Sequence, residues 1–150
     1  MHKLFYYAIA IIVLASNTDL VRAAAYYFSG SVNVEEAFAF MQSSTLVDRL
    51  YMLVGNAFNY ASVFFCWILF RKREYLPKFC SLWAGLSASA LYFFVSTWDL
   101  WVPIAQGASM SDGFAMGFVK ITLYANIIGL LSCMLGLAVG KQLQTKQNAR

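Results

Sequence analysis

Long uncharged hydrophobic stretches alternate along the chain with short segments that carry the charged residues. A helix that crosses a bilayer needs roughly 20 mainly apolar residues. Three stretches of about this length contain no charged residue, and they cover residues 50–70, 79–98 and 121–140. Each of these stretches therefore predicts one transmembrane helix.

The amino-terminal hydrophobic stretch allows two interpretations. Its apolar run, residues 4–16, is short, and Asp19 and Arg22 follow it closely. In the first interpretation, a retained helix covers about residues 4–21, and these two charges lie one turn apart at its outer end. In the second, the run is the hydrophobic region of a secretory signal that is removed by cleavage. We favour the retained helix, which gives four transmembrane helices, whereas cleavage would leave three.

The distribution of Lys and Arg predicts the orientation of these helices, because cytoplasmic loops carry an excess of both. With a cytoplasmic amino terminus and four helices, eight of the eleven basic residues lie inside and six of the seven acidic residues lie outside. The opposite orientation would translocate the cluster Arg71-Lys72-Arg73. Both termini are therefore expected in the cytoplasm. We interpret the cluster as a topology determinant, with attraction of anionic lipid headgroups as the alternative.

A short amphipathic helix is predicted in the first outer loop, which covers about residues 23–49. Asn33 and Glu36 have the spacing of a capping box, in which each side chain bonds the backbone N–H of the other. The apolar residues that follow share one helical face: Val34, Ala37, Phe38 and Met41. We expect this helix to close the loop, and a lid or a docking element for a partner is the alternative.

Small residues recur at every fourth position in the third and fourth predicted helices. These two stripes are Ser81, Gly85 and Ser89 in the third helix, and Ser132, Gly136 and Gly140 in the fourth. Stripes of this kind let helix backbones approach closely in a bilayer. We expect the two stripes to pack against each other within the monomer, and a homo-oligomer interface is the alternative.

Three asparagines lie inside predicted transmembrane helices. Asn56 and Asn59 are one turn apart in the second helix, and Asn126 lies in the fourth at a depth similar to that of Asn56. Side-chain amides in a bilayer need hydrogen-bond partners, so we expect bonds that join helices. A polar vestibule open to the outside is the alternative. At the outer ends of the third and fourth helices, Asp99 and Lys120 are candidates for an ion pair.

The composition supports a membrane protein. Of the 150 residues, 61% are hydrophobic and only 12% are charged, whereas a soluble domain carries roughly 25% charged residues. The aromatic content of 17% also excludes a disordered chain. The expected fold is a single all-α domain over residues 1–150, a polytopic membrane protein in contact with the lipid bilayer. The net charge of +4 arises from inner loops and tails, so no nucleic acid partner is expected.

The residue types that most catalytic and metal sites need are missing from the predicted helices. The single histidine is His2, so neither haem ligation nor a His-based zinc site is expected. The three cysteines lie on three different helices and form no C-x-x-C motif. No acidic residue lies deep inside a predicted helix, which argues against a proton-coupled transporter. We therefore expect a non-enzymatic protein without a catalytic residue, a cofactor or a metal.

One third of the chain resembles a known family. Leu53-Val54-Gly55-Asn56 precedes a hydrophobic helix that ends in the basic turn Phe70-Arg71-Lys72-Arg73, and Pro77 comes before the next helix. This region resembles the YdgK-like family of small four-helix bacterial inner-membrane proteins, in which an acidic residue matches Asp99. The family has no characterised activity, so the resemblance implies a topology and a bacterial inner membrane.

These patterns predict an accessory protein that binds another membrane protein through its small-residue stripes and its outer loop. The alternative is a small channel or transporter whose pore forms in a homo-oligomer. In that alternative, Asn56, Asn59 and Asn126 line an outward vestibule.

Overall fold

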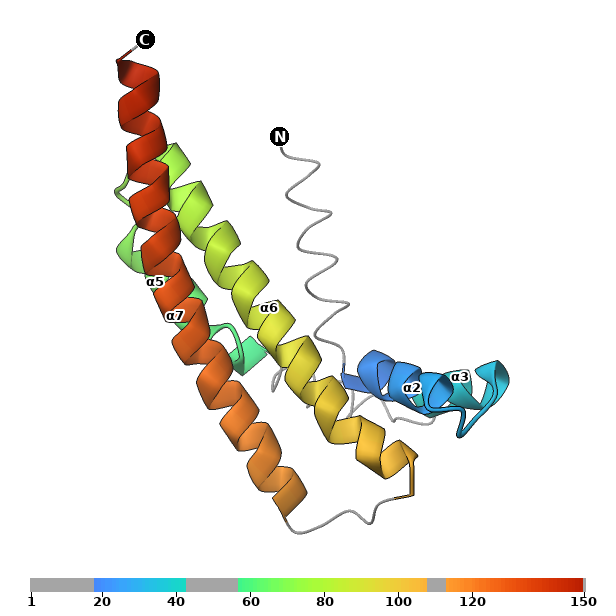
Figure 1. The fold of residues 1–150 in the computed structure, drawn as a ribbon. Coiled ribbons are helices and arrows are strands. Elements are labelled where there is room, and N and C mark those ends of the chain that lie inside the picture. Colours follow the sequence, from blue (N-terminus) through green and yellow to red (C-terminus); the bar gives the residue numbers. More distant parts are fainter. Residues whose placement is uncertain (1–17, 43–56, 108–112, 150) are drawn as a thin grey trace.

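The computed structural model describes residues 18–42, 57–107 and 113–149, and this part of the chain is all-helical, as the sequence predicts. Its helices in chain order are α2 (Thr18–Phe28), α3 (Val34–Gln42), α5 (Ala61–Leu69), α6 (Tyr75–Ala105) and α7 (Gly113–Asn148) (Figure 1). Most of the helix expected over residues 4–21 lies outside the described residues, and so does Asn56.

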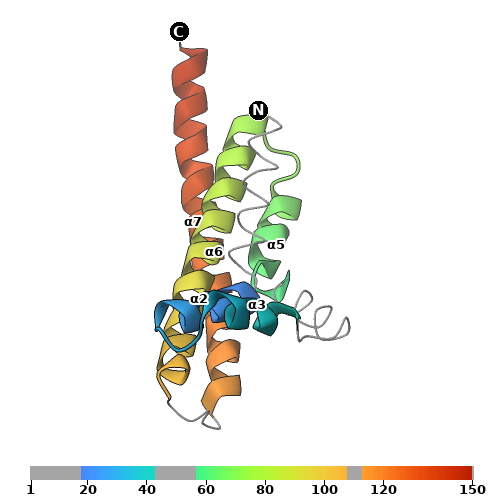
Figure 2. The same cartoon turned by 90° about the vertical axis from the view of Figure 1, so that its right-hand side faces the viewer.

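The two long helices, α6 and α7, run antiparallel and side by side, and they form the body of the structure (Figures 1 and 2). They contain 31 and 36 residues, which corresponds to about 46 and 54 Å at the α-helical rise. Both are long and apolar enough to cross a membrane. They enclose the expected helices over residues 79–98 and 121–140 and extend beyond them, because backbone hydrogen bonding continues where the side chains become charged.

The hydrophobic stretch over residues 50–70 does not form one continuous helix. α5 begins at Ala61, after a turn at Asn59 and Tyr60 in which the Tyr60 N–H donates to the Ala57 carbonyl at 3.1 Å. α5 has nine residues, so it reaches only about 13 Å, and it packs against both α6 and α7. The structure therefore differs from the uninterrupted helix that hydropathy predicts, and Asn126 on α7 bonds backbone groups of Phe58 and Ser62 on the two sides of the break.

Helix α2 lies against the carboxyl-terminal part of α6, and α3 packs on α2 (Figures 1 and 2). The guanidinium carbon of Arg22 lies 4.9 Å from the centroid of the Trp101 ring, a distance typical of a cation–π contact. After α2 ends at Phe28, the Ser31 hydroxyl donates to the backbone carbonyl of Ala105, the last residue of α6. These contacts hold α2 and the turn that follows it against the carboxyl-terminal end of α6.

The short helix expected in the outer loop is present as α3, and it has the predicted capping box. The Asn33 N–H donates to Glu36 Oε2 at 3.1 Å, and the Glu36 N–H donates to Asn33 Oδ1 at 2.9 Å. Ala37 is buried, whereas Val34 is 49% exposed. The described part of the apolar face is therefore only partly covered by the rest of the chain.

Candidate functional site

The contact between α6 and α7, here called the seam, is held by two side-chain hydrogen bonds to backbone carbonyls. The Ser81 hydroxyl donates to the Cys133 carbonyl at 2.8 Å, and the Ser89 hydroxyl donates to the Ala125 carbonyl at 3.0 Å. Both serines are buried. A carbonyl in a helix has a second lone pair, so these bonds form without breaking the backbone bonds of α7.

Glycines in the seam bring the two backbones close together. A Cβ at Gly136 would meet the Cys80 carbonyl oxygen and would lie 2.8 Å from the Ala84 Cβ, and a Cβ at Gly140 would lie 2.5 Å from the Pro77 Cα. A Cβ at Gly85 would likewise meet Cys133 Sγ. Both predicted stripes therefore contribute to the contact between α6 and α7 within the monomer, but they do not face each other: Gly136 and Gly140 meet Pro77, Cys80 and Ala84 in place of Ser81, Gly85 and Ser89.

The α7 side of the seam includes residues that the sequence stripe missed. Ser132 is only half-buried, and the adjoining row of Ala125, Gly129 and Cys133 is the one that meets Ser81, Gly85 and Ser89. Gly129 is the point where three helices meet. A Cβ there would contact Ser89 Oγ on α6 and would lie 3.1 Å from Ser62 Oγ on α5. The regular spacing of four from residue 125 to residue 133 was the available signal for this row.

Asn126 holds the start of α5 against α7. Its Oδ1 accepts a hydrogen bond from the Ser62 N–H at 2.8 Å, and its Nδ2 donates to the Phe58 carbonyl at 2.8 Å. A third bond from Nδ2 goes to the Thr122 carbonyl of its own helix at 2.9 Å. The break before Ala61 leaves backbone groups without helical partners, and one amide satisfies a donor and an acceptor there. The side chain thus joins helices, but it does so through backbone groups.

Asn59 differs from Asn126 in its surroundings. It is 1% exposed, and its Oδ1 is buried without a hydrogen-bond partner in the part of the chain that the structure describes. No bond joins it to Asn126 within that part. Asn56 lies outside the described residues, so the cluster of the three asparagines stays a prediction.

The expected ion pair between Asp99 and Lys120 does not form. Both residues are exposed, and no salt bridge joins them within residues 57–107 and 113–149. Asp99 lies two residues from both Thr97 and Trp101, which are buried. Two residues correspond to about 200° around a helix, so Asp99 points away from the packed face of α6.

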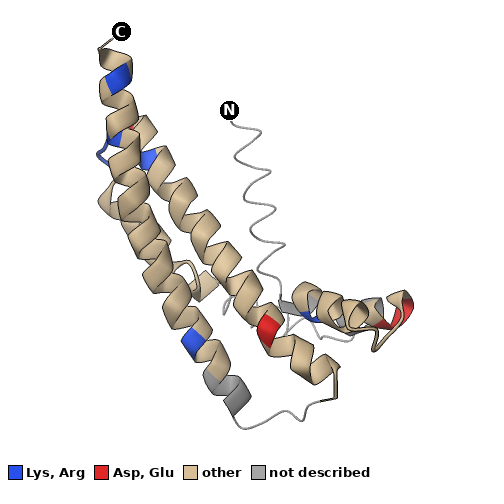
Figure 3. Cartoon of the chain, in the orientation of Figure 1, with Lys and Arg blue, Asp and Glu red and all other residues tan. Residues whose placement is uncertain are grey.

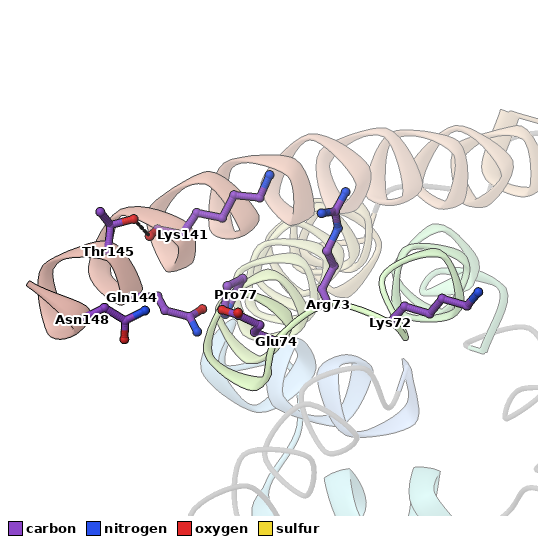
Figure 4. Close-up of a pocket in the computed structure, with 8 residues that line it drawn as sticks. All are labelled: Lys72, Arg73, Glu74, Pro77, Lys141, Gln144, Thr145 and Asn148. Atoms are coloured by element: carbon purple, nitrogen blue, oxygen red, sulfur yellow. Dashed lines mark hydrogen bonds between the residues drawn. The ribbon is translucent and has the colours of Figure 1, made fainter.

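A pocket of about 360 Å³ (Figure 4) lies where α6 begins and α7 ends, at the opposite end of the hairpin from α2 and α3 (Figure 1). The connection from α5 to α6 supplies Lys72, Arg73 and Glu74, and the first turn of α6 supplies Pro77. The last turns of α7 supply the other lining residues: Lys141, Gln144, Thr145 and Asn148. These four follow the spacing i, i+3, i+4 and i+7, which places them on one helical face. The sequence pattern indicates the basic cluster, but it gives no sign of this polar face.

The chemistry of these sites is that of hydrogen bonding and charge. Among the described residues, no group of three or more His, Cys, Asp or Glu side chains is placed to hold a metal ion. Cys66 and Cys133 are buried together beside Val63 where α5 meets α7, and both are free thiols. The seam and Asn126 hold the helices together, whereas the pocket carries cationic and amide side chains on the surface of the bundle.

Comparison of the chain with family models, with curated proteins and with solved structures gave no significant match.

Proposed function

We propose that the chain is an integral membrane protein with four transmembrane helices and both termini in the cytoplasm, and that it acts as a non-enzymatic accessory protein of another membrane complex. A bacterial inner membrane is the proposed location, in line with the resemblance to the YdgK-like family.

The single observation that carries the membrane assignment is the inverted polarity of the helix pair. Ser89 and Thr97 are fully buried, whereas Leu91 is 66% and Leu135 is 68% exposed. In water this distribution is unfavourable, because burial of apolar area is the main favourable term in folding. In a bilayer the surface meets lipid tails, and small or polar residues supply the contacts between helices. A lipid environment therefore explains the exposed leucines and the buried polar residues of this helix pair, whereas an aqueous environment does not.

The charges fit the same placement. The charge-free stretches 79–98 and 121–140 are each about 30 Å long as helices, close to the thickness of the hydrocarbon core. Figure 3 shows the described charged residues outside the middle of the α6–α7 hairpin. Trp67 and Lys78 lie at one end, with the Lys78 ammonium 5.1 Å from the Trp67 ring centroid. Trp and Lys are typical anchors at the membrane surface.

The surface of α2 and α3 supports the accessory role. Tyr27 and Phe28 are 46% and 73% exposed at the end of α2, and Val34 is 49% exposed at the start of α3. The small-residue stripes are occupied within the monomer, so a partner protein has this outer surface available to it in place of the stripes. Exposed aromatic residues are the usual anchors of protein interfaces.

The experiment is purification of the full chain in mild detergent from native membranes, followed by mass analysis of the proteins that co-purify. The proposal expects a membrane protein at a fixed stoichiometry, and it expects Phe28→Ser to remove that protein. Leu135→Ala, on the exposed face of α7, is the matched control and should leave it bound. A chain recovered from the soluble fraction contradicts the membrane assignment, and a clean homo-oligomer contradicts the accessory role.

A second candidate function, a small oligomeric channel or transporter, is favoured by one observation only. The Asn59 amide oxygen is buried and has no partner among the described residues, and a water or a solute admitted to that position would supply one. Flux of ions or small solutes in liposomes, lost in Asn59→Leu but retained in Ser132→Ala, would establish this function, and absence of flux would exclude it.

A further inference from the structure

The pocket at the end of the hairpin exists because α7 is longer than the helix it packs on. Gly140 packs against Pro77 in the first turn of α6, and α7 then continues to Asn148. Beyond Gly140, the face of α7 that follows the seam carries hydrogen-bonding side chains, among them Gln144 and Asn148, in place of glycines. Along this face of α7, closely packed glycines are thus replaced by polar side chains at the level where α6 begins.

The charge in the pocket is positive. Lys72, Arg73 and Lys141 contribute three cations and Glu74 contributes one carboxylate, which leaves two positive charges. The side chains of Arg73 and Lys141 extend to the same side of the pocket, whereas Lys72 points away from α7 (Figure 4). The amino terminus of α6 adds the positive end of its helix dipole to the same region.

The lining therefore offers what a phosphate group needs. Arg and Lys form charge-assisted hydrogen bonds to phosphate oxygens, and the side-chain amides of Gln144 and Asn148 are further donors on the α7 wall. The Thr145 hydroxyl already donates to the Lys141 carbonyl at 3.0 Å. A volume of about 360 Å³ falls within the usual range of small-molecule sites. A carboxylate, by contrast, disfavours an anion, so Glu74 is expected to limit the affinity.

The depth of the pocket indicates the source of the phosphate. Lys141 directly follows the charge-free stretch of α7, and Lys78, which lies over Trp67, directly precedes the charge-free stretch of α6. With the hairpin across a bilayer, which rests on the proposed function, this level is that of the lipid headgroups. Basic pockets between helices at the cytoplasmic surface are suited to anionic headgroups.

We propose that this pocket is a binding site for a phosphate-bearing anion, and that an acidic phospholipid in the adjacent leaflet supplies it through its headgroup. Arg73 and Lys141 bind the phosphate oxygens, and the polar face of α7 orients the rest of the headgroup. Glu74 opposes binding and sets its strength.

The test uses the full chain, purified in mild detergent, and measures binding of short-chain phosphatidylglycerol, short-chain phosphatidylcholine and inorganic phosphate by native mass spectrometry. A cation near an anionic lipid contributes about fivefold to affinity, so the double variant Arg73→Gln/Lys141→Gln should weaken phosphatidylglycerol binding by roughly 25-fold. The control Arg71→Gln/Lys146→Gln removes the same charge from positions that do not line the pocket, and it should change binding by less than about fivefold.

Glu74→Gln gives an independent test, because it is expected to strengthen lipid binding and not to weaken it. It removes the opposing charge and should tighten phosphatidylglycerol binding by about fivefold, which a variant that fails to fold cannot do. Binding of inorganic phosphate with the same dependence on Arg73 and Lys141, and no preference for the lipid, would support the anion site but assign it to a soluble phosphate. Equal losses in the two double variants, or equal binding of the two lipids, would overturn the proposal. If the wild-type chain is recovered in membranes, such a result overturns the lipid site alone; recovery in the soluble fraction would contradict the membrane assignment instead.

Discussion

Substitution of Asn126 by leucine is predicted to destabilise the junction between α5 and α7. Leucine has the same number and branching of side-chain heavy atoms as asparagine, so the change removes hydrogen bonds while it leaves the space filled. The Ser62 N–H and the Phe58 carbonyl then lose the partners that lie 2.8 Å away in the structure. Both groups belong to the break in the helix, where no helical bond replaces them.

The size of the effect follows from the number of bonds that cross between helices. Two of the three bonds made by Asn126 do so, and the third goes to Thr122 in its own helix. Hydrogen bonds between membrane helices average about 0.6 kcal/mol and reach about 1.7 kcal/mol. The expected loss for Asn126→Leu is therefore roughly 1 to 3 kcal/mol in the free energy of unfolding.

Asn59→Leu is the matched comparison, because it makes the same chemical change at a buried asparagine in the same part of the fold. Asn59 Oδ1 has no hydrogen-bond partner among the described residues, so leucine removes a buried polar group and breaks no bond. We expect no loss of stability and a gain of up to about 1 kcal/mol.

The assay is unfolding of each purified variant in mild detergent by titration with sodium dodecyl sulfate, followed by tryptophan fluorescence and far-ultraviolet circular dichroism. The reasoning requires opposite outcomes for the two asparagines. It is refuted if Asn126→Leu unfolds at the wild-type midpoint, or if Asn59→Leu is the more damaging of the two.

Two further predictions concern the seam and the outer loop. Gly136→Leu should destabilise the α6–α7 pair by about 1 to 3 kcal/mol or more, because a Cβ there already meets the Cys80 carbonyl oxygen. The control Ala138→Leu, on the exposed face of α7, should change the unfolding midpoint little. Equal effects of the two substitutions would contradict close packing of α6 and α7 at Gly136. Asn33→Ala removes the capping bond to the Glu36 N–H and should destabilise α3 by about 1 kcal/mol. Amide hydrogen exchange in α3 should then be about fivefold faster, while exchange in α6 is unchanged. Unaltered exchange in α3 would mean that the capping box does not stabilise the helix.

Local patterns predicted the elements that local forces determine. The capping box formed by Asn33 and Glu36 depends on a spacing of three, and the structure has it. The hairpin of α6 and α7 follows from two long uncharged stretches, and the spacing of Gly136 and Gly140 is that of a close helix contact. Each of these features is encoded within a few turns of one helix.

Features that depend on distant residues could not be read in the same way. The sequence around Asn59 and Tyr60 contains no charged residue and no proline, and the break there is supported by Asn126, which comes more than sixty residues later. Gly129 belongs to the seam because Ser62 of α5 and Ser89 of α6 both lie close to it. The missing ion pair of Asp99 and Lys120 shows the same limit, because proximity along the membrane normal does not fix the direction of a side chain.

The pocket at the end of the hairpin required the relative lengths of two helices. Hydropathy ends the fourth predicted helix at residue 140, whereas α7 continues to Asn148. Only that extension places Gln144 and Thr145 beside the connection that carries Arg73. The basic cluster was visible in the sequence, but its partner face was not.

The most direct test of the account is the accessibility of single cysteines along the exposed face of α7 in native membranes. In a cysteine-free chain, Leu123→Cys, Leu131→Cys and Leu135→Cys replace side chains that are 57%, 59% and 68% exposed. The account predicts that all three resist a charged, membrane-impermeant maleimide even after the membrane is opened, because lipid covers them, whereas Gln142→Cys reacts rapidly. Reaction of Leu135→Cys as fast as Gln142→Cys would place this face in water and contradict a membrane-spanning α7.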